Sequence, residues 1–200
     1  MRLFVGIVPP EGVVGSLQNL QVEAKKLLPE HSITDERKAT PEHFRIPHSP
    51  WRLSKKDSLH LTLQFLGDGI SHHRCDEIAA ALSKVGQEKF EVECYGAGAF
   101  PSPQAARVLW AGAKSLELSD LAREVNSQMG KVGFAAGKPF SPHISIARCK
   151  FPSNVSEFAR AYADKEWHGQ KWAVDSFSLI ESIITFGGHE YNQIRKYQLL

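Results

Sequence analysis

The sequence predicts a mixed fold of helices and strands, forming one domain or two close lobes, in which one plan occurs twice. Three observations support this prediction. The chain has 200 residues, of which 42% are hydrophobic, and this is enough for one substantial core. Apolar residues recur with helical spacing in some segments and with strand spacing in others. Two short segments, 59–63 and 142–146, repeat the pattern histidine, apolar, hydroxyl, apolar.

The chain opens with a predicted strand and a predicted helix. Residues 3–8 form a short apolar run that two prolines end, as expected of a buried strand. A helix is expected over about 11–28, because apolar residues recur on one side of it, namely Val13, Leu17, Leu20, Ala24 and Leu27. The stretch 30–50 is rich in proline and has no clear period. It predicts a long loop with three exposed histidines, His31, His43 and His48.

The first half continues with a strand, a helix and another strand. Residues 59–66 alternate as a strand, and the glycines around Asp68 signal a turn. Ser71 can cap a helix whose buried side is Cys75, Ile78, Leu82 and Val85. Residues 90–95 alternate as a further strand.

The second half repeats this plan. Residues 107–112 predict a strand, and a helix follows with Leu118, Leu121, Val125 and Met129 on one side. After a stretch broken by glycines comes the strand with the second motif, and then a helix over about 153–164 and strands over 172–179, 182–186 and 194–199. A duplicated unit often packs about a pseudo-two-fold axis, which would bring His60 and His143 together across a cleft.

Composition narrows the class of protein. The formal net charge is +2 and the pI is near 8.4, which argues against a nonspecific nucleic-acid coat protein and an acidic disordered chain. The three cysteines are widely spaced and form no CxxC pair, as is typical of a reduced cytoplasmic protein. The apolar start is too short for a signal peptide, and no stretch approaches a membrane span.

The two histidine motifs are the candidate functional site. Side chains two residues apart lie on one face of a strand, so His60 lies beside Thr62 and His143 beside Ser145. One such histidine would most simply be structural, but two copies at matching points of a duplicated plan indicate function. The adjacent His72 and His73 would point about 100° apart on a helix, which argues against a metal site there.

Paired imidazoles suit in-line displacement at phosphorus. The unperturbed imidazole pKa is about 6.5, so one neutral ring can take a proton from water while a charged one protonates the leaving oxygen. Thr62 and Ser145 can donate to the non-bridging oxygens. No HExxH or Asp-rich motif occurs, so neither a metal nor another cofactor is predicted.

Two arginines are candidates for the cation that such a site needs. Arg107 opens a strand of the second half, and Arg148 is the better candidate because it follows His143 by five residues. An odd offset puts Arg148 on the other face of a regular strand. A twist or a bulge in this strand would bring the guanidinium back to the site.

With these residues, the chain resembles the 2H phosphoesterases, and within them the bacterial and archaeal RNA 2′,3′-cyclic phosphodiesterases, historically called 2′-5′ RNA ligases. The resemblance covers most of the chain. It rests on both motifs with their flanks and on the matching segments 2–7, 59–67, 98–103, 107–110 and 139–148, and on the spacing of Tyr191, Ile194, Tyr197 and Leu199.

The resemblance implies an α+β fold with two pseudo-symmetric lobes around a central cleft, each lobe an antiparallel sheet with packed helices, in a single domain over residues 1–200. It implies metal-independent hydrolysis of a terminal 2′,3′-cyclic phosphate of RNA to a 2′-phosphomonoester, with possible reversible 2′-5′ ligation. His60 would be the general acid and His143 the general base. Thr62, Ser145 and Arg148 would hold the phosphate.

The chain departs from the family in two places. The stretch 30–50 is longer than expected, and Ser141 stands where an arginine is common. Phe140 and Trp51 could stack on a base, although core packing is the simpler reading for Trp51. We expect a monomer with RNA 3′ ends as its partner, and with neither a membrane nor an obligatory protein partner. The alternative functions are a phosphodiesterase for another small cyclic nucleotide phosphate and a non-catalytic module that binds RNA ends.

Overall fold

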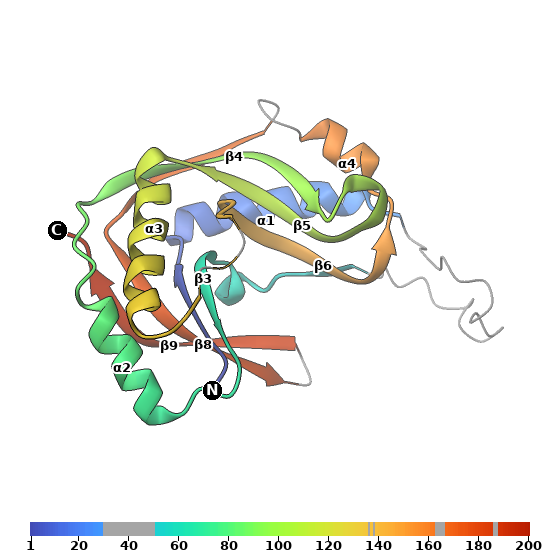
Figure 1. The fold of residues 1–200 in the computed structure, drawn as a ribbon. Coiled ribbons are helices and arrows are strands. Elements are labelled where there is room, and N and C mark those ends of the chain that lie inside the picture. The colour runs from blue at the N-terminus through green and yellow to red at the C-terminus, as the bar shows by residue number, and fades with distance from the viewer. Residues whose placement is uncertain (30–50, 136, 138, 163–166, 186–187) are drawn as a thin grey trace.

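The computed structural model describes residues 1–29, 51–135, 137, 139–162, 167–185 and 188–200. Within them, the strands form one antiparallel sheet in the order β7-β4-β5-β6-β3-β1-β8-β9, and β2 pairs with β6 (Figure 1). The strands are β1 (Leu3–Ile7), β2 (Trp51–Leu53), β3 (Leu61–Gly67), β4 (Phe90–Phe100), β5 (Ala106–Lys114), β6 (His143–Ser153), β7 (His168–Val174), β8 (Ser176–Thr185) and β9 (Gly188–Gln198).

The sheet consists of two halves that meet at one narrow junction. One half is β7-β4-β5-β6 and the other is β3-β1-β8-β9. They are joined through a single antiparallel pair, Leu61 of β3 with Ile144 of β6. Both of these residues are fully buried, so the junction is fixed by the core beneath it. This arrangement confirms the α+β fold with two halves. The origin of the halves by duplication stays a prediction.

Four helices of the described residues cover the sheet: α1 (Glu11–Leu27), α2 (His72–Leu82), α3 (Leu116–Lys131) and α4 (Ser156–Ala161). The expected apolar sides of α1, α2 and α3 are buried. Helix α1 packs on β6 and β7, and α3 packs on α2, β3 and β4 (Figure 1). None of these helices is long and apolar enough to cross a membrane. All three cysteines are buried and outside any disulfide.

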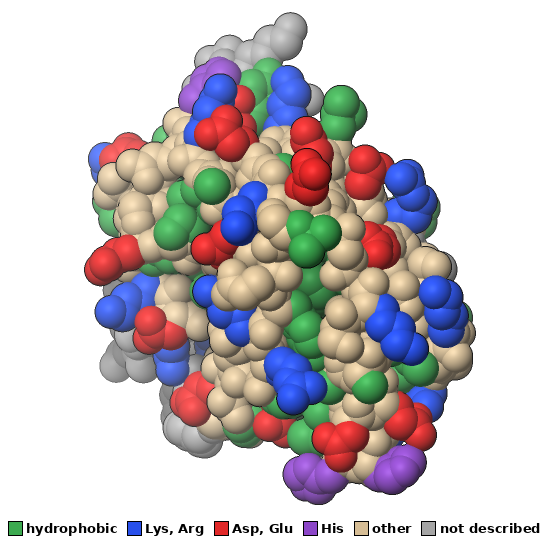
Figure 2. All heavy atoms as spheres, turned by 90° about the vertical axis from the view of Figure 1, so that its left-hand side faces the viewer, with side chains coloured by type: hydrophobic (Ala, Val, Ile, Leu, Met, Phe, Trp, Pro, Cys, Tyr) green, Lys and Arg blue, Asp and Glu red, His purple; other side chains and the backbone are tan. Residues whose placement is uncertain are grey.

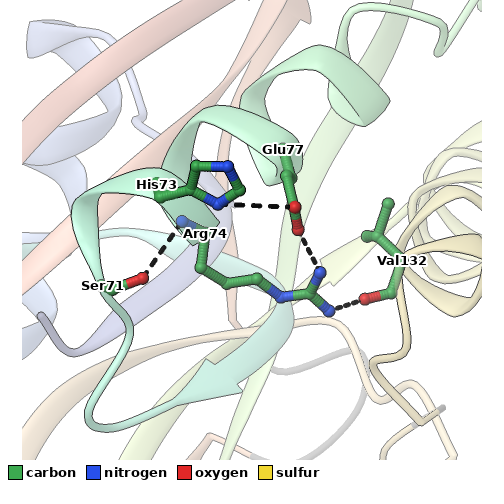
Figure 3. A network of polar contacts seen from close by, with 5 residues as sticks. All are labelled: Ser71, His73, Arg74, Glu77 and Val132. Carbon is green, nitrogen blue, oxygen red and sulfur yellow. Dashed lines mark hydrogen bonds and ion pairs between the residues drawn. The ribbon is translucent and has the colours of Figure 1, made fainter.

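A polar network ties α2 to the end of α3 (Figure 3). Ser71 caps α2 as expected, because its hydroxyl accepts a hydrogen bond of 3.2 Å from the Arg74 amide. The Arg74 guanidinium bonds both Glu77 and the Val132 carbonyl, and it lies 5.1 Å from the centroid of the Phe134 ring. Arg74 therefore anchors the start of the segment that leads from α3 to the second histidine motif.

Some predicted boundaries are wrong. The strand expected over 172–179 is broken at Asp175, whose carbonyl accepts a hydrogen bond from the Leu199 amide, and the chain then forms the long hairpin of β8 and β9. The helix expected over 153–164 is the shorter α4, because Ser153 still pairs with Ala106 in the sheet. The predicted loop 30–50 and its three histidines lie outside the described residues.

Candidate active site

The two histidine motifs lie side by side at the junction of the half-sheets. The pair of Leu61 with Ile144 is antiparallel, so continuing its register by one residue sets His60 opposite Ser145 and Thr62 opposite His143. The two histidines are then diagonal neighbours, which in a regular sheet are about 7–8 Å apart. The structure thus brings all four motif side chains to one place, as the sequence predicts.

A backbone carbonyl holds each imidazole in the same way. His60 Nδ1 lies 2.8 Å from the carbonyl oxygen of Ser58, and His143 Nδ1 lies 2.7 Å from that of Ser141. A carbonyl can only accept, so in a neutral ring the proton is on Nδ1 and the lone pair is on Nε2. Each ring is therefore held with its Nε2 free of these bonds. The residue two positions before each histidine supplies the carbonyl, and sequence analysis gave no signal for it.

Aromatic rings pack against both imidazoles. Phe4 and Tyr191 lie 4.6 and 4.7 Å from the His60 ring, measured between centroids, and Tyr191 is edge-on to it. Phe100 lies 5.0 Å from the His143 ring, again edge-on. These contacts restrict both rings and remove water from around them. Tyr191 was noted in the sequence only for its spacing, so its place beside His60 is a new finding.

The four motif residues line two pockets. A pocket of about 180 Å³ is lined by His60, Ser145 and Arg148, together with Arg52, Leu53, Ser54, Lys55, Ser58, His189 and Tyr191. A larger pocket of about 1050 Å³ is lined by Thr62 and His143 and by apolar and polar residues that include Leu63, Gln64, Phe65, Phe100, Arg107, Asn126 and Phe140. Each pocket therefore holds one motif histidine with the hydroxyl of the other motif.

A β-bulge returns Arg148 to the site face of β6. Leu109 of β5 pairs with Ala147 and Trp110 pairs with Ser145, which leaves Ile146 as the extra residue. Beyond the bulge the facing reverses, and Arg148 Nη2 donates to Ser145 Oγ at 3.2 Å. This irregularity of the strand overcomes the odd offset between His143 and Arg148. The other candidate cation, Arg107, lines the larger pocket instead.

A buried glutamine supports this bulge from beneath. Gln21 of α1 is 5% exposed, and its Nε2 donates to the carbonyls of Ile146 at 2.7 Å and Ser54 at 2.8 Å. Ser54 completes the support, because its amide donates to the Ile146 carbonyl at 2.9 Å and its hydroxyl to the Ser145 carbonyl at 2.8 Å. Gln21 lies on the apolar side of a predicted helix, and a polar residue there was the one signal that could have found it.

The first motif has a matching bulge. Val5 of β1 pairs with Gln64 and Gly6 pairs with Thr62, so Leu63 is the extra residue. It follows His60 by three positions, as Ile146 follows His143. The residue five positions after each histidine is therefore turned to the site face. In the first motif this residue is Phe65, which is 64% exposed and lines the larger pocket.

Both imidazoles are easier to deprotonate than a free histidine. Burial lowers the pKa of His60 to about 4 against the opposing effect of the Ser58 carbonyl, and the charges of Arg148 and His143 lower it further. Burial also lowers the pKa of His143, and Arg148 adds to the effect. With no anion bound, both rings are therefore neutral at pH 7.

The remaining candidates are placed as follows. Phe140 is half-buried and lines the larger pocket. Trp51 is 6% exposed and belongs to the core, which agrees with the simpler reading of this residue. Within the described ranges, no three His, Cys, Asp or Glu side chains gather as metal ligands would.

This fold and this site define a class of protein, the phosphoesterases with two histidine motifs on adjoining strands. Comparisons with known proteins agree. The family model of the 2′-5′ RNA ligase superfamily matches residues 32–183. The RNA 2′,3′-cyclic phosphodiesterase of Archaeoglobus fulgidus is 33% identical over 144 residues, which are 71% of this chain and 80% of that protein. The enzyme of the same name from Methanothermobacter thermautotrophicus is 32% identical over 146 residues, 72% of this chain and 79% of that protein.

A solved structure agrees over nearly the whole chain. The protein TT0787 of Thermus thermophilus superposes with a TM-score of 0.75 at 25% identity, and the match covers 99% of this chain and 97% of that one. The chain therefore belongs to the 2′-5′ RNA ligase superfamily, and the resemblance seen in its sequence is confirmed.

Proposed function

We propose that this protein is an RNA 2′,3′-cyclic phosphodiesterase, which opens a terminal 2′,3′-cyclic phosphate to a 2′-phosphomonoester. The observation that carries the proposal is the pair of neighbouring imidazoles, each held through Nδ1 by a carbonyl with Nε2 left free. Two hydroxyls and a guanidinium accompany them. The names of the curated relatives support the same activity.

The proposed reaction is an in-line displacement. His143 Nε2 takes a proton from water as its oxygen attacks phosphorus, and His60 gives a proton to O3′ as the P–O3′ bond breaks. Thr62, Ser145 and Arg148 hold the non-bridging oxygens, where negative charge develops. After turnover His60 is neutral and His143 is charged, so exchange of protons with solvent restores the starting state.

The substrate itself supplies the protonation state that this mechanism needs. Both rings have lowered pKa values in the free protein, so both are neutral at pH 7, with Nε2 unprotonated. An anionic phosphate between the rings raises the pKa of each, and substrate binding then takes up one proton. We expect a bell-shaped dependence of rate on pH, with kcat/KM optimal at a lower pH than kcat, which initial rates from pH 4 to 9 would measure.

The terminal nucleoside is expected in the larger pocket. At about 1050 Å³ it has room for a base and a ribose, whereas the smaller pocket has not. Phe65 and Phe140 offer aromatic surfaces for stacking, worth about 1–3 kcal/mol per base in related systems. This placement keeps Phe140 as a proposed contact and adds Phe65 to it.

The decisive experiment is incubation of an RNA that ends in a 2′,3′-cyclic phosphate, with the position of the product phosphate read by NMR or by enzymatic digestion. We expect a 2′-phosphate, formed equally well in the presence of a chelator. Preference for a free cyclic mononucleotide over RNA would favour the first alternative substrate class. Tight binding of the RNA end with no turnover would favour the binding module.

His60→Ala and His143→Ala test the two proton carriers. Each should lower kcat by about 10²–10⁴-fold, because general acid or base catalysis is lost, while both variants stay folded by circular dichroism. His72→Ala, an exposed histidine on α2, is the matched control and should keep full activity. Equal turnover in the control and in either site variant would contradict the mechanism.

A further inference from the structure

The smaller pocket carries more positive charge than the proposed chemistry uses. Arg148 is assigned to the reacting phosphate, yet Arg52 and Lys55 also line this pocket beside His60 and Ser145. The net charge of the chain is only +2, so a local excess of cations is not a general property of the molecule. On the face that carries α2 and α3, Lys and Arg are interspersed with Asp and Glu (Figure 2).

Arg52 is held directly against the catalytic strand. Strand β2 pairs with β6 on the same edge as β3, because β5 occupies the other edge. In this pairing Arg52 lies opposite Arg148, so both side chains are on the same face. Like charges at opposite positions of an antiparallel pair are destabilising. A fold that keeps them together at an open pocket indicates that an anion offsets their repulsion.

Acidic side chains of the described chain do not neutralise this pair. Asp57 of the 3₁₀ turn η3 (Lys56–Ser58) and Glu190 of β9 come from neighbouring elements, and both are exposed. No ion pair within the described ranges joins either of them to Arg52, Lys55 or Arg148. The guanidinium of Arg52 and the ammonium of Lys55 are thus available to a ligand.

A third group, the imidazole of His189, also lies at the opening of the smaller pocket. His189 of β9 lines the smaller pocket, and its Nδ1 lies 2.9 Å from Oγ of Ser182, which is 7% exposed. Ser182 restrains the ring and leaves Nε2 for a ligand. Two cations and a restrained imidazole therefore surround one opening next to His60.

We propose that this rim, formed by Arg52, Lys55 and His189, binds the phosphodiester that precedes the cyclic end of an RNA strand. The inference rests on the proposed function. The pocket adjoins the reacting phosphate but is too small for a nucleoside, as its volume of about 180 Å³ shows. A negatively charged backbone group that continues from the terminal ribose fits both its size and its charge. Guanidinium groups bind phosphate oxygens in bidentate fashion. The site thus selects oligonucleotides over mononucleotides.

The test compares two substrates that differ by one nucleotide, so that only the longer one has a phosphodiester before the cyclic end. These are uridine 2′,3′-cyclic phosphate and the dinucleotide that ends in the same cyclic nucleotide. We expect wild-type kcat/KM to be at least about tenfold higher for the dinucleotide. Arg52→Ala should lower kcat/KM for the dinucleotide about tenfold more than for the mononucleotide, and Lys55→Ala should act in the same direction. Lys84→Ala, an exposed lysine beyond α2, is the matched control.

Salt dependence gives a second readout. Each phosphate contact to a single strand contributes about −0.7 to the slope of log affinity against log salt. Arg52→Ala should therefore flatten the slope of log kcat/KM for the dinucleotide by about that amount. Circular dichroism would show that the variant is folded.

The outcomes separate this proposal from the proposed function. If wild type hydrolyses both substrates equally well, the preceding phosphodiester is not recognised and this inference is wrong, while the activity stands. If Arg52→Ala lowers kcat/KM for both substrates by the same factor, Arg52 holds the reacting phosphate instead, and the inference is again wrong. If wild type hydrolyses neither substrate, the proposed function itself fails.

Discussion

The two motif-bearing strands share one construction and differ in the kind of side chain that their bulges turn to the site. In each, a histidine bonded to the carbonyl two residues before it is followed by a hydroxyl and then by a one-residue bulge. The bulge turns the fifth residue after the histidine to the site. That residue is Phe65 in β3 and Arg148 in β6. In the proposed mechanism the shared part transfers the protons, and the residue at the fifth position sets the direction in which the substrate lies.

The largest expected effect in this comparison comes from replacing Phe65 and Arg148, the residues five positions after each histidine, one at a time. Arg148→Ala should lower kcat by about 10²–10³-fold, because a charge that stabilises the developing anion is lost. Phe65→Ala should instead raise KM about tenfold with little change in kcat, because stacking is equally strong in the ground state and the transition state. Steady-state kinetics on an RNA with a cyclic end would measure both parameters.

Arg148→Lys is the conservative control, since it keeps the charge and loses the bidentate geometry, and we expect it to recover part of kcat. A loss of kcat in Phe65→Ala as large as that in Arg148→Ala would contradict the division of roles between the two bulges.

A second test concerns how the two motif histidines affect the stability of the folded protein in acid. The pKa of His60 falls from 6.5 in the unfolded chain to about 4 in the folded protein, so the unfolded state binds the proton more tightly. The corresponding stability is present above pH 6.5 and is lost as the pH falls towards 4. Between pH 7 and pH 5, wild type should lose about 2 kcal/mol that His60→Gln does not lose.

Urea unfolding at both pH values would measure this difference. His143→Gln should have the same sign, since burial also lowers the pKa of His143. It should also raise the pKa of His60, because a neighbouring positive charge is removed. An unchanged pH dependence in His60→Gln would mean that the ring is protonated in the native state.

The part of the site that could be predicted is the part that follows the two-residue period of a strand. His60, Thr62, His143 and Ser145 obey the two-residue period of a strand, so their shared faces could be read from sequence. Their meeting depended on the duplicated plan and was inferred from it. The pairing of Leu61 with Ile144 supplies what the sequence could not, namely the register that joins the two halves.

Features that depend on a partner strand or a distant helix were not predictable. A bulge is a mismatch in length between two strands, so neither Leu63 nor Ile146 marks it alone. The break at Asp175 lies between apolar residues that together resemble one continuous strand. Sequence alone offered no reason to expect a functional role for Arg52, because that role depends on its position opposite Arg148.

Gln21 offers the finest test, because it acts on one motif alone. Gln21→Leu keeps the volume but removes the donor to the carbonyls of Ile146 and Ser54, and we expect a loss of about 1–2 kcal/mol in the free energy of unfolding. The bulge should also shift, which would misplace Arg148 and lower kcat several-fold. Gln128→Leu, a buried glutamine on α3, should lower stability without this loss of kcat.

A double-mutant cycle separates the structural role from the positioning role. If Gln21 acts through Arg148, then adding Gln21→Leu to Arg148→Ala should cost stability again but leave kcat where the single Arg148→Ala variant has it. Independent, multiplicative losses of kcat would instead mean that Gln21 supports the site by another route. The first motif provides the contrast, since the KM effect of Phe65→Ala should be unaltered by Gln21→Leu.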